Sequence, residues 1–199
     1  LLDLLAQNNN YDPYLRHAAI MGIISCGGAD KIASLKKHES PAVRLASVVA
    51  LRRLRDDRLV NLLTDENPKI ADEVIRAIND TAMENIRPAL AALLDDYAIN
   101  AASGPGRDIT PMMMRRLIHS GYRVGGEKNI ARLIKLADNT KLPLEERMEV
   151  TRLLASWTEP HVVDHSIGKH YPLPKRDFDK TKAALAKNFN PLLSADTPI

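Results

Sequence analysis

One motif decides the fold of this chain, and it occurs three times: Asp12-Pro13-Tyr14-Leu15-Arg16, Ser40-Pro41-Ala42-Val43-Arg44 and Asn67-Pro68-Lys69-Ile70-Ala71. The three prolines are separated by 28 and 27 residues. Asp, Ser and Asn often cap helix N-termini, and a proline in the first helical position gives up no hydrogen bond. A fixed period of this length is typical of helical repeats, in which each unit buries its apolar face only against its neighbours.

The small and apolar positions of each repeat follow one face of a helix. In the first repeat they are Leu15, Ala18, Gly22, Ile23 and Cys26, and a shift of one repeat places Cys26 on Leu54. This helical spacing predicts that Cys26 is a buried, inert thiol. A shorter apolar run follows each such helix, so the helices are expected in pairs. The sequence therefore predicts an all-α fold, a right-handed α-α superhelix (a HEAT/ARM-like solenoid) of about five helix pairs.

The repeat weakens along the chain. Glu73 interrupts the apolar face of the third repeat, and loop-forming residues near 98–110 stop the period. Helices are expected to resume after Pro111 and to continue to Trp157, and a final helix is expected at about residues 178–188. The predicted domains are HEAT-like repeats at residues 1–157 and a Pro-rich extended segment with a terminal capping helix at residues 158–199.

Composition limits the possible functions. The net charge is +3, and the basic excess lies in residues 101–199, which hold 16 Lys and Arg against 11 Asp and Glu. The single cysteine excludes an internal disulfide. No apolar run of about 20 residues predicts a membrane span. The chain starts at Leu1 in an apparent helix, so it reads as a piece of a longer protein. No dinucleotide, phosphate-loop or nucleophile-elbow motif is present, so we expect no catalytic residue and no cofactor.

Three arginines, Arg115, Arg116 and Arg123, form the densest basic group of the second half. A guanidinium group can donate two parallel hydrogen bonds to a phosphate or a carboxylate. These three arginines are therefore the candidate anion-binding residues. An ordinary solvated surface is the competing interpretation. Arg16 and Arg44 occupy matching repeat positions, and we expect them to form a ladder between repeats with acids such as Asp56 or Asp57. The alternative is that these two arginines are part of a binding groove.

Two further candidates lie at the end of the predicted repeats. Trp157 is expected to close the stack, or else to anchor a partner. His161, His165 and His170 are weak candidates for metal ligands, because Pro160 and Gly168 argue against the regular helix that would bring them together. Scattered surface or packing histidines are the preferred interpretation, so no metal is predicted.

The Pro-led helix starts resemble HEAT repeats of the short variety, over residues 11–97 and more loosely over 110–157. The second half resembles a narrower family through Gly125-Gly126-Glu127-Lys128-Asn129-Ile130, Leu153-Leu154-Ala155-Ser156-Trp157-Thr158-Glu159-Pro160 and Gly168-Lys169-His170-Tyr171-Pro172-Leu173-Pro174. These are similar to the HEAT segment of large exported bacterial proteins of the membrane-bound dehydrogenase type. In that family a sorbosone-dehydrogenase-like propeller precedes the HEAT segment and a haem-c domain follows it.

The resemblance implies a non-catalytic scaffold or protein-interaction module in a periplasmic or extracytoplasmic setting. Its expected partner is either a separate protein or the neighbouring domains of the same chain. The alternative is a nucleic-acid-binding protein that resembles the HEAT-like alkylated-base DNA glycosylases, with Arg115, Arg116 and Arg123 on phosphates. A lyase of the bilin-attaching HEAT type is a third hypothesis, and it lacks a candidate acid. Nucleic acid is the less favoured partner because the basic excess is mild.

Overall fold

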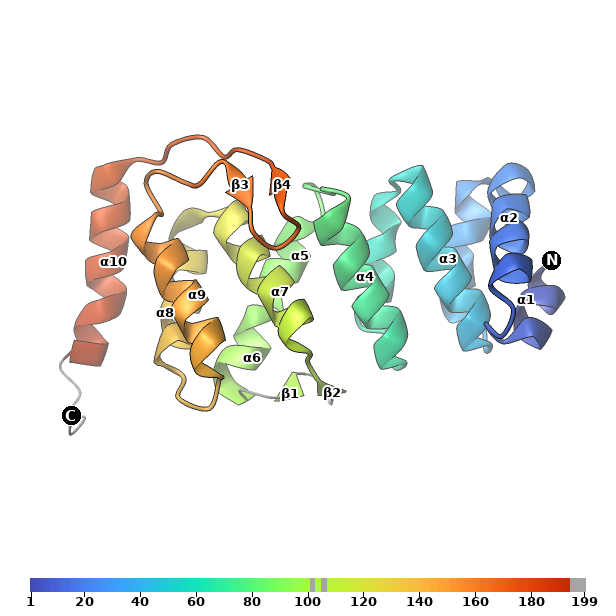
Figure 1. Cartoon of the computed structure of the whole chain (residues 1–199), viewed down its shortest axis with the longest axis horizontal. Coiled ribbons are helices and arrows are strands. Elements are labelled where there is room, and N and C mark those ends of the chain that lie inside the picture. Colours follow the sequence, from blue (N-terminus) through green and yellow to red (C-terminus); the bar gives the residue numbers. More distant parts are fainter. Residues whose placement is uncertain (101–102, 105–106, 194–199) are drawn as a thin grey trace. The chain divides into compact units, whose positions relative to one another are not determined.

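The computed structural model describes residues 1–100, 103–104 and 107–193, and side chains in 1–97 and 109–189. The described chain is mostly helical (Figure 1). Its contacts divide it into two compact units, Leu1–Ile86 and Arg87–Ile199. The division falls inside the predicted repeat region, and the segment after residue 157 belongs to the second unit.

The first unit consists of helices that pack against their neighbours in sequence. Its elements are α1 (Leu2–Asn8), α2 (Pro13–Ser34), the 3-10 turn η1 (Leu35–Lys37), α3 (Pro41–Leu54), η2 (Asp57–Leu62) and α4 (Pro68–Asp80). The α3 helix contacts both α2 and α4, and α1 contacts α2 and α3 (Figure 1). The expected partner helices of the first two pairs are therefore short, and consist partly of 3-10 turns.

The three predicted helix starts are confirmed. Asp12 accepts hydrogen bonds from the backbone amides of Tyr14 and Leu15, and Asn67 accepts one from Lys69. Ser40 is also the N-cap, but its side chain makes no capping hydrogen bond. Each helix begins at the proline that follows, where the missing N–H has no intrahelical partner to lose.

The expectation for Cys26 is wrong, because its side chain is exposed. The repeat alignment pairs it with Leu54, which is also 41% exposed. Both lie near the end of a helical stretch, Cys26 before the non-helical Gly28 and Leu54 before the left-handed Arg55. Leu15 and Ala18 of the predicted face are exposed as well, whereas α2 buries Ala19, Ile20, Ile23 and Ile32. The buried face of α2 therefore differs from the predicted one, and of the five predicted positions only Ile23 is buried.

One stretch, Pro13–Lys37, is long and apolar enough by length and composition to span a membrane, with a mean hydropathy of 1.3. Buried core helices and signal sequences meet the same criteria, and 22% of the apolar window in this stretch is buried. Gly28, with φ 70° and ψ 152°, interrupts the helical conformation within this stretch, which divides it into two shorter helical pieces.

The second unit contains α5 (Arg87–Ala92), α6 (Leu94–Asn100), β1 (Ser103–Gly104), β2 (Arg107–Asp108), α7 (Pro111–Val124), α8 (Gly126–Asp138), α9 (Leu144–Ala155), β3 (Val163–Asp164), β4 (Lys169–His170) and α10 (Phe178–Leu193). Here α7, α8 and α9 contact one another, α5 packs on α7, and α10 packs on α8. The predicted final helix is confirmed and is longer than expected. We call residues 158–177, which connect Trp157 to α10, the strap.

The two strands of the strap form an antiparallel pair that the sequence analysis did not predict. Val163 pairs with His170 and Asp164 with Lys169. Gly168, with φ 65°, supplies the turn, and its amide donates a 2.8 Å hydrogen bond to the carbonyl of Asp164. The strap is otherwise extended, as expected.

Candidate functional site

The predicted basic group on α7 does not form one site. Arg115 is exposed beside a small cavity of about 150 Å³ that Glu145, Glu146 and Glu149 also line. Arg116 donates a 3.2 Å hydrogen bond to the carbonyl of Met112, one turn earlier on the same helix. Arg123 is buried, so only Arg115 and Arg116 of the three reach the surface.

Arg123 is used inside the second unit, where its side chain is 4% exposed. Its Nη1 lies 3.3 Å from Asp164 Oδ2 and donates a 3.1 Å hydrogen bond to the carbonyl of Tyr171. The guanidinium carbon lies 3.6 Å from the centre of the Tyr171 ring, which is a cation–π contact. Arg123, which belongs to α7, therefore contacts the strap at Asp164 in β3 and at Tyr171, just after β4.

Trp157 is also buried, at 2% exposure, and it belongs to a second arginine contact. The guanidinium carbon of Arg176 lies 4.4 Å from the Trp157 ring centre and 4.7 Å from that of Tyr122. Arg176 also donates hydrogen bonds to the backbone carbonyls of Trp157 and Tyr122. Burial lowers the pKa of Arg176 from its ordinary value. Trp157 thus packs in the interior and is not presented to a partner.

A histidine and two carboxylates connect α7, α9 and the strap. His119 Nε2 lies 2.8 Å from Glu149 Oε1, and its Nδ1 lies 3.5 Å from Asp164 Oδ1. The hydrogen bond with His119 holds the pKa of Glu149 below its usual range, against the effect of burial. Burial alone would raise the pKa of Asp164, but hydrogen bonds from Ser166 and the charges of His119 and Arg123 leave it below the ordinary value.

This cluster was missed by the sequence analysis because its members lie 15 to 45 positions apart and belong to no motif. His119 and Asp164 are at most 3% exposed, while Glu149 is 14% exposed and also lines the small cavity beside Arg115. The cluster connects α7, α9 and the strap.

The three weak metal candidates, His161, His165 and His170, are all exposed. The rings of His161 and His165 lie 5.2 Å apart in an edge-to-face contact. Within the described part of the chain, no group of three or more His, Cys, Asp or Glu side chains could hold a metal ion.

The largest gathering of accessible cations lies instead in the first unit. A groove of about 430 Å³ crosses one face of α2, α3 and α4, and we call it the basic groove. It is lined by Pro13, Arg16, His17, Ile20, Leu45, Val49, Arg52, Arg53, Glu73 and Arg76. Four arginines and one histidine thus surround a single carboxylate.

Glu73, which breaks the apolar pattern of the third repeat, has a defined role in this groove. Its Oε1 lies 2.8 Å from Arg52 Nη1 and its Oε2 lies 3.5 Å from Arg76 Nε. The Glu73 side chain is 16% exposed, whereas those of Arg52 and Arg76 are more open to solvent. Glu73 therefore fixes two guanidinium groups at the groove without occupying their remaining donors.

The expected ladder of Arg16 and Arg44 is present only in part, and its partners differ from those predicted. Arg44 contacts Asp65 through two hydrogen bonds, Nε to Oδ2 at 2.9 Å and Nη2 to Oδ1 at 3.1 Å. It does not pair with Asp56, which binds Arg58. No ion pair of Arg16 is found among the described residues, and Arg16 lines the basic groove.

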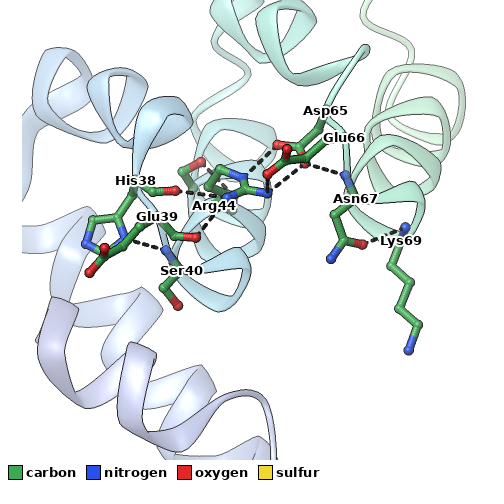
Figure 2. A network of polar contacts seen from close by, with 9 residues as sticks. His38, Glu39, Ser40, Arg44, Asp65, Glu66, Asn67 and Lys69 are labelled. Atoms are coloured by element: carbon green, nitrogen blue, oxygen red, sulfur yellow. Dashed lines mark hydrogen bonds and ion pairs between the residues drawn. The ribbon is translucent and has the colours of Figure 1, made fainter.

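Figure 2 shows how Arg44 joins two turns of the first unit. Its Nη1 donates to the carbonyls of His38 at 3.0 Å and Glu39 at 3.1 Å, just before α3. Asp65, just before α4, accepts from Arg44 and also from the backbone amide of Asn67 at 2.9 Å. Asp65 raises the pKa of Arg44, although burial opposes this. The network connects the start of α3 to the turn before α4.

The basic groove was not predicted as a whole, since the sequence analysis offered only Arg16, together with Arg44, as an alternative part of a binding groove. Its arginines come from different places in their repeats: Arg16 is in the first turn of α2, Arg52 and Arg53 are in the last turn of α3, and Arg76 is in the middle of α4. The one available signal was Glu73, a carboxylate on an otherwise apolar face. Comparison with known proteins adds no assignment, because the chain matches no family model, no curated protein and no solved structure.

Proposed function

We propose that this chain is a non-catalytic helical-repeat module of the HEAT type, a right-handed α-α superhelix that binds another protein or a neighbouring domain. The observation that carries the proposal is the basic groove, which is open to solvent and crosses three consecutive helices. Interaction through a surface built from successive repeats is how helical-repeat proteins generally act.

The buried polar groups support the same proposal. Arg44, Arg123 and Arg176 all bind backbone carbonyls within their own unit. His119 and its two carboxylates are likewise used to join α7, α9 and the strap. Of these groups, Arg44 lies in the first unit and connects the start of α3 to the turn before α4, two helices that line the basic groove. A surface that is ordered before a partner arrives costs less to order on binding.

The family resemblance adds a proposed setting. Strap elements such as Gly168, Tyr171 and Pro172 match the more specific part of the exported dehydrogenase-type pattern. We therefore propose that the chain serves as the interdomain segment of a larger redox-type protein in an extracytoplasmic compartment. Sequencing the full reading frame tests this: a propeller before Leu1 and a haem-binding Cys-x-x-Cys-His after Ile199 are expected.

Binding of protein can be tested directly by panning a random peptide library against the intact chain. Enriched peptides should bind saturably with one site per chain, and they should protect amides of α2, α3 and α4 from hydrogen exchange. Failure to enrich any binding peptide, or purification of the chain with a stoichiometric cofactor and a turnover activity, would overturn the proposal. A steeply salt-dependent gel shift with DNA would favour the nucleic-acid class instead.

A further inference from the structure

The basic groove combines two surfaces of different chemistry. Its floor is apolar and includes Ile20, Leu45 and Val49, while its sides carry positively charged groups. Arg53 and His17 are exposed, and Arg76 is 52% exposed. An occupant that satisfies both surfaces needs carboxylates or phosphates beside a small apolar group.

The positive charge of this groove is not neutralised within the first unit. Arg52 and Arg76 share the one carboxylate of Glu73. Across the described residues, no ion pair or side-chain hydrogen bond is found for Arg16 or Arg53. Four guanidinium groups against one carboxylate leave an excess of three positive charges at the groove, with His17 counted as neutral.

This excess is local. Residues 1–86 contain 11 Lys and Arg against 12 Asp and Glu, so this unit has a net charge of 11 − 12 = −1. A protein surface that binds nucleic acid through phosphates usually carries a broad basic face or stripe. A small basic groove on a nearly neutral unit instead suits a short peptide segment that carries only a few negative charges.

The path across the three helices that line the groove is long enough for a short peptide to follow. Neighbouring helices pack about 8–10 Å apart, so a path across α2, α3 and α4 covers about 20 Å between the outer helix axes. A helical peptide of about 14 residues has that length, at about 1.5 Å per residue. Such a helix can place carboxylates on two sides of an apolar stripe.

We propose that the basic groove binds an acidic peptide segment of a partner protein, with its carboxylates on Arg16, Arg53 and Arg76 and an apolar side chain on the floor. This inference rests on the proposed function, because it names the partner chemistry of the same surface. Glu73 acts as a positioning residue that holds Arg52 and Arg76 for the incoming carboxylates.

The test uses a fluorescein-labelled helical peptide with the repeat Glu-Glu-Leu-Ala and a matched peptide with Gln in place of Glu. Binding to the intact chain is measured by fluorescence anisotropy at low and at physiological salt. The Glu peptide should bind at least about tenfold more tightly than the Gln peptide, and salt should weaken this difference. The double variant R16E/R53E should lose about tenfold or more in affinity for the Glu peptide.

K31E/K69E is the matched control, because it reverses two charges in the first unit, as R16E/R53E does, on exposed residues outside the groove. It should retain the affinity of the unaltered chain. Circular dichroism of all variants verifies that the fold is retained. Arg53→Gln, which removes a charge without adding one, should give an intermediate loss and serves if the double variant does not fold.

Equal binding of the Glu and Gln peptides, or equal losses in R16E/R53E and K31E/K69E, would overturn the inference. Tighter binding of an oligothymidylate of the same charge would assign the groove to nucleic acid and overturn it as well. If library-selected peptides bind the chain but no acidic peptide does, this inference fails while the proposed function stands. If no peptide of any composition binds, both fail.

Discussion

The basic groove of the first unit and the strap of the second unit use the same side chain in opposite ways. At the groove, Arg53 faces solvent beside other cations, and nothing in the described first unit neutralises it. At the strap, Arg176 lies between two aromatic rings and donates to two carbonyls. A buried guanidinium with its donors satisfied stabilises the fold, whereas an exposed one is available to bind a partner.

The difference shows why counting arginines in the sequence does not locate a binding site. The second half holds more basic residues, yet the donors of Arg123 and Arg176 bind backbone carbonyls inside the second unit. The first half is slightly acidic overall, yet it carries the accessible basic groove. Position in the tertiary structure, rather than local charge density, decides which arginine can bind an anion.

The largest expected effect is a loss of stability at Arg44, the buried arginine of the first unit. It contrasts with the exposed arginines of the groove. Asp65→Ala should lower the free energy of unfolding by about 2–4 kcal/mol, because it leaves Arg44 buried without its bidentate partner. Both side chains are at most 7% exposed. Urea unfolding followed by far-ultraviolet circular dichroism measures the change. Glu66→Ala is the control, because Glu66 is 86% exposed and should matter little; equal losses in the two variants would contradict the role of Arg44.

A somewhat smaller loss is expected at the strap. Arg176→Ala should cost about 2–3 kcal/mol, because it removes the contacts with Tyr122 and Trp157 and leaves two buried carbonyls unpaired. Trp157 is the single tryptophan, so its fluorescence during urea unfolding reports on this site. The neighbouring Lys175→Ala removes only an exposed pair with Glu159 and should have little effect. An Arg176→Ala protein with unchanged stability and unchanged fluorescence would contradict the stabilising role of the Arg176 contacts with Tyr122 and Trp157.

Acid should weaken the second unit to a lesser extent. The folded-state pKa values of Asp164 and Glu149 lie below their ordinary values, so the unfolded chain binds protons more readily. Their contribution to stability is complete above an unfolded pKa of about 4 and is lost as the pH falls through the folded values. The urea midpoint should therefore decrease from pH 6 to pH 3. It is followed by Trp157 fluorescence at intervals of about one pH unit. Glu149→Gln should make this decrease shallower; a midpoint that rises toward pH 3 would contradict the assignment.

The smallest effect on stability is expected at the groove. Arg53→Ala should change the free energy of unfolding by no more than about 0.5 kcal/mol, because the side chain is exposed and makes no ion pair among the described residues. Urea unfolding measures this too. A loss above about 1 kcal/mol would show that Arg53 is a structural residue, and the contrast between groove and strap would disappear.

Much of the fold could be predicted from local sequence. Asp12-Pro13, Ser40-Pro41, Asn67-Pro68 and Thr110-Pro111 each start a helix where expected, and Gly125 separates α7 from α8. Caps, prolines and glycines act within a few residues, so their effects are visible in sequence. Cys26 was misjudged, together with Leu15 and Ala18, because helical periodicity does not tell which face of a helix its neighbours cover.

The candidate site could not be predicted in the same way. Arg16, Arg52 and Arg76 come from three helices and three different repeat positions, and only packing brings them to one groove. The partners of Arg44 were mistaken for the same reason, since Asp65 lies 21 residues away and no motif marks the pair.

The sequence alone determined where the chain forms helices, because capping, proline geometry and apolar period are properties of short segments. Only the tertiary structure decided which charged side chains are buried and which remain open. Burial depends on contacts between segments distant in sequence, such as Arg123 with Tyr171 and Glu73 with Arg52. That distinction separates the arginines that hold the strap from those that form the basic groove.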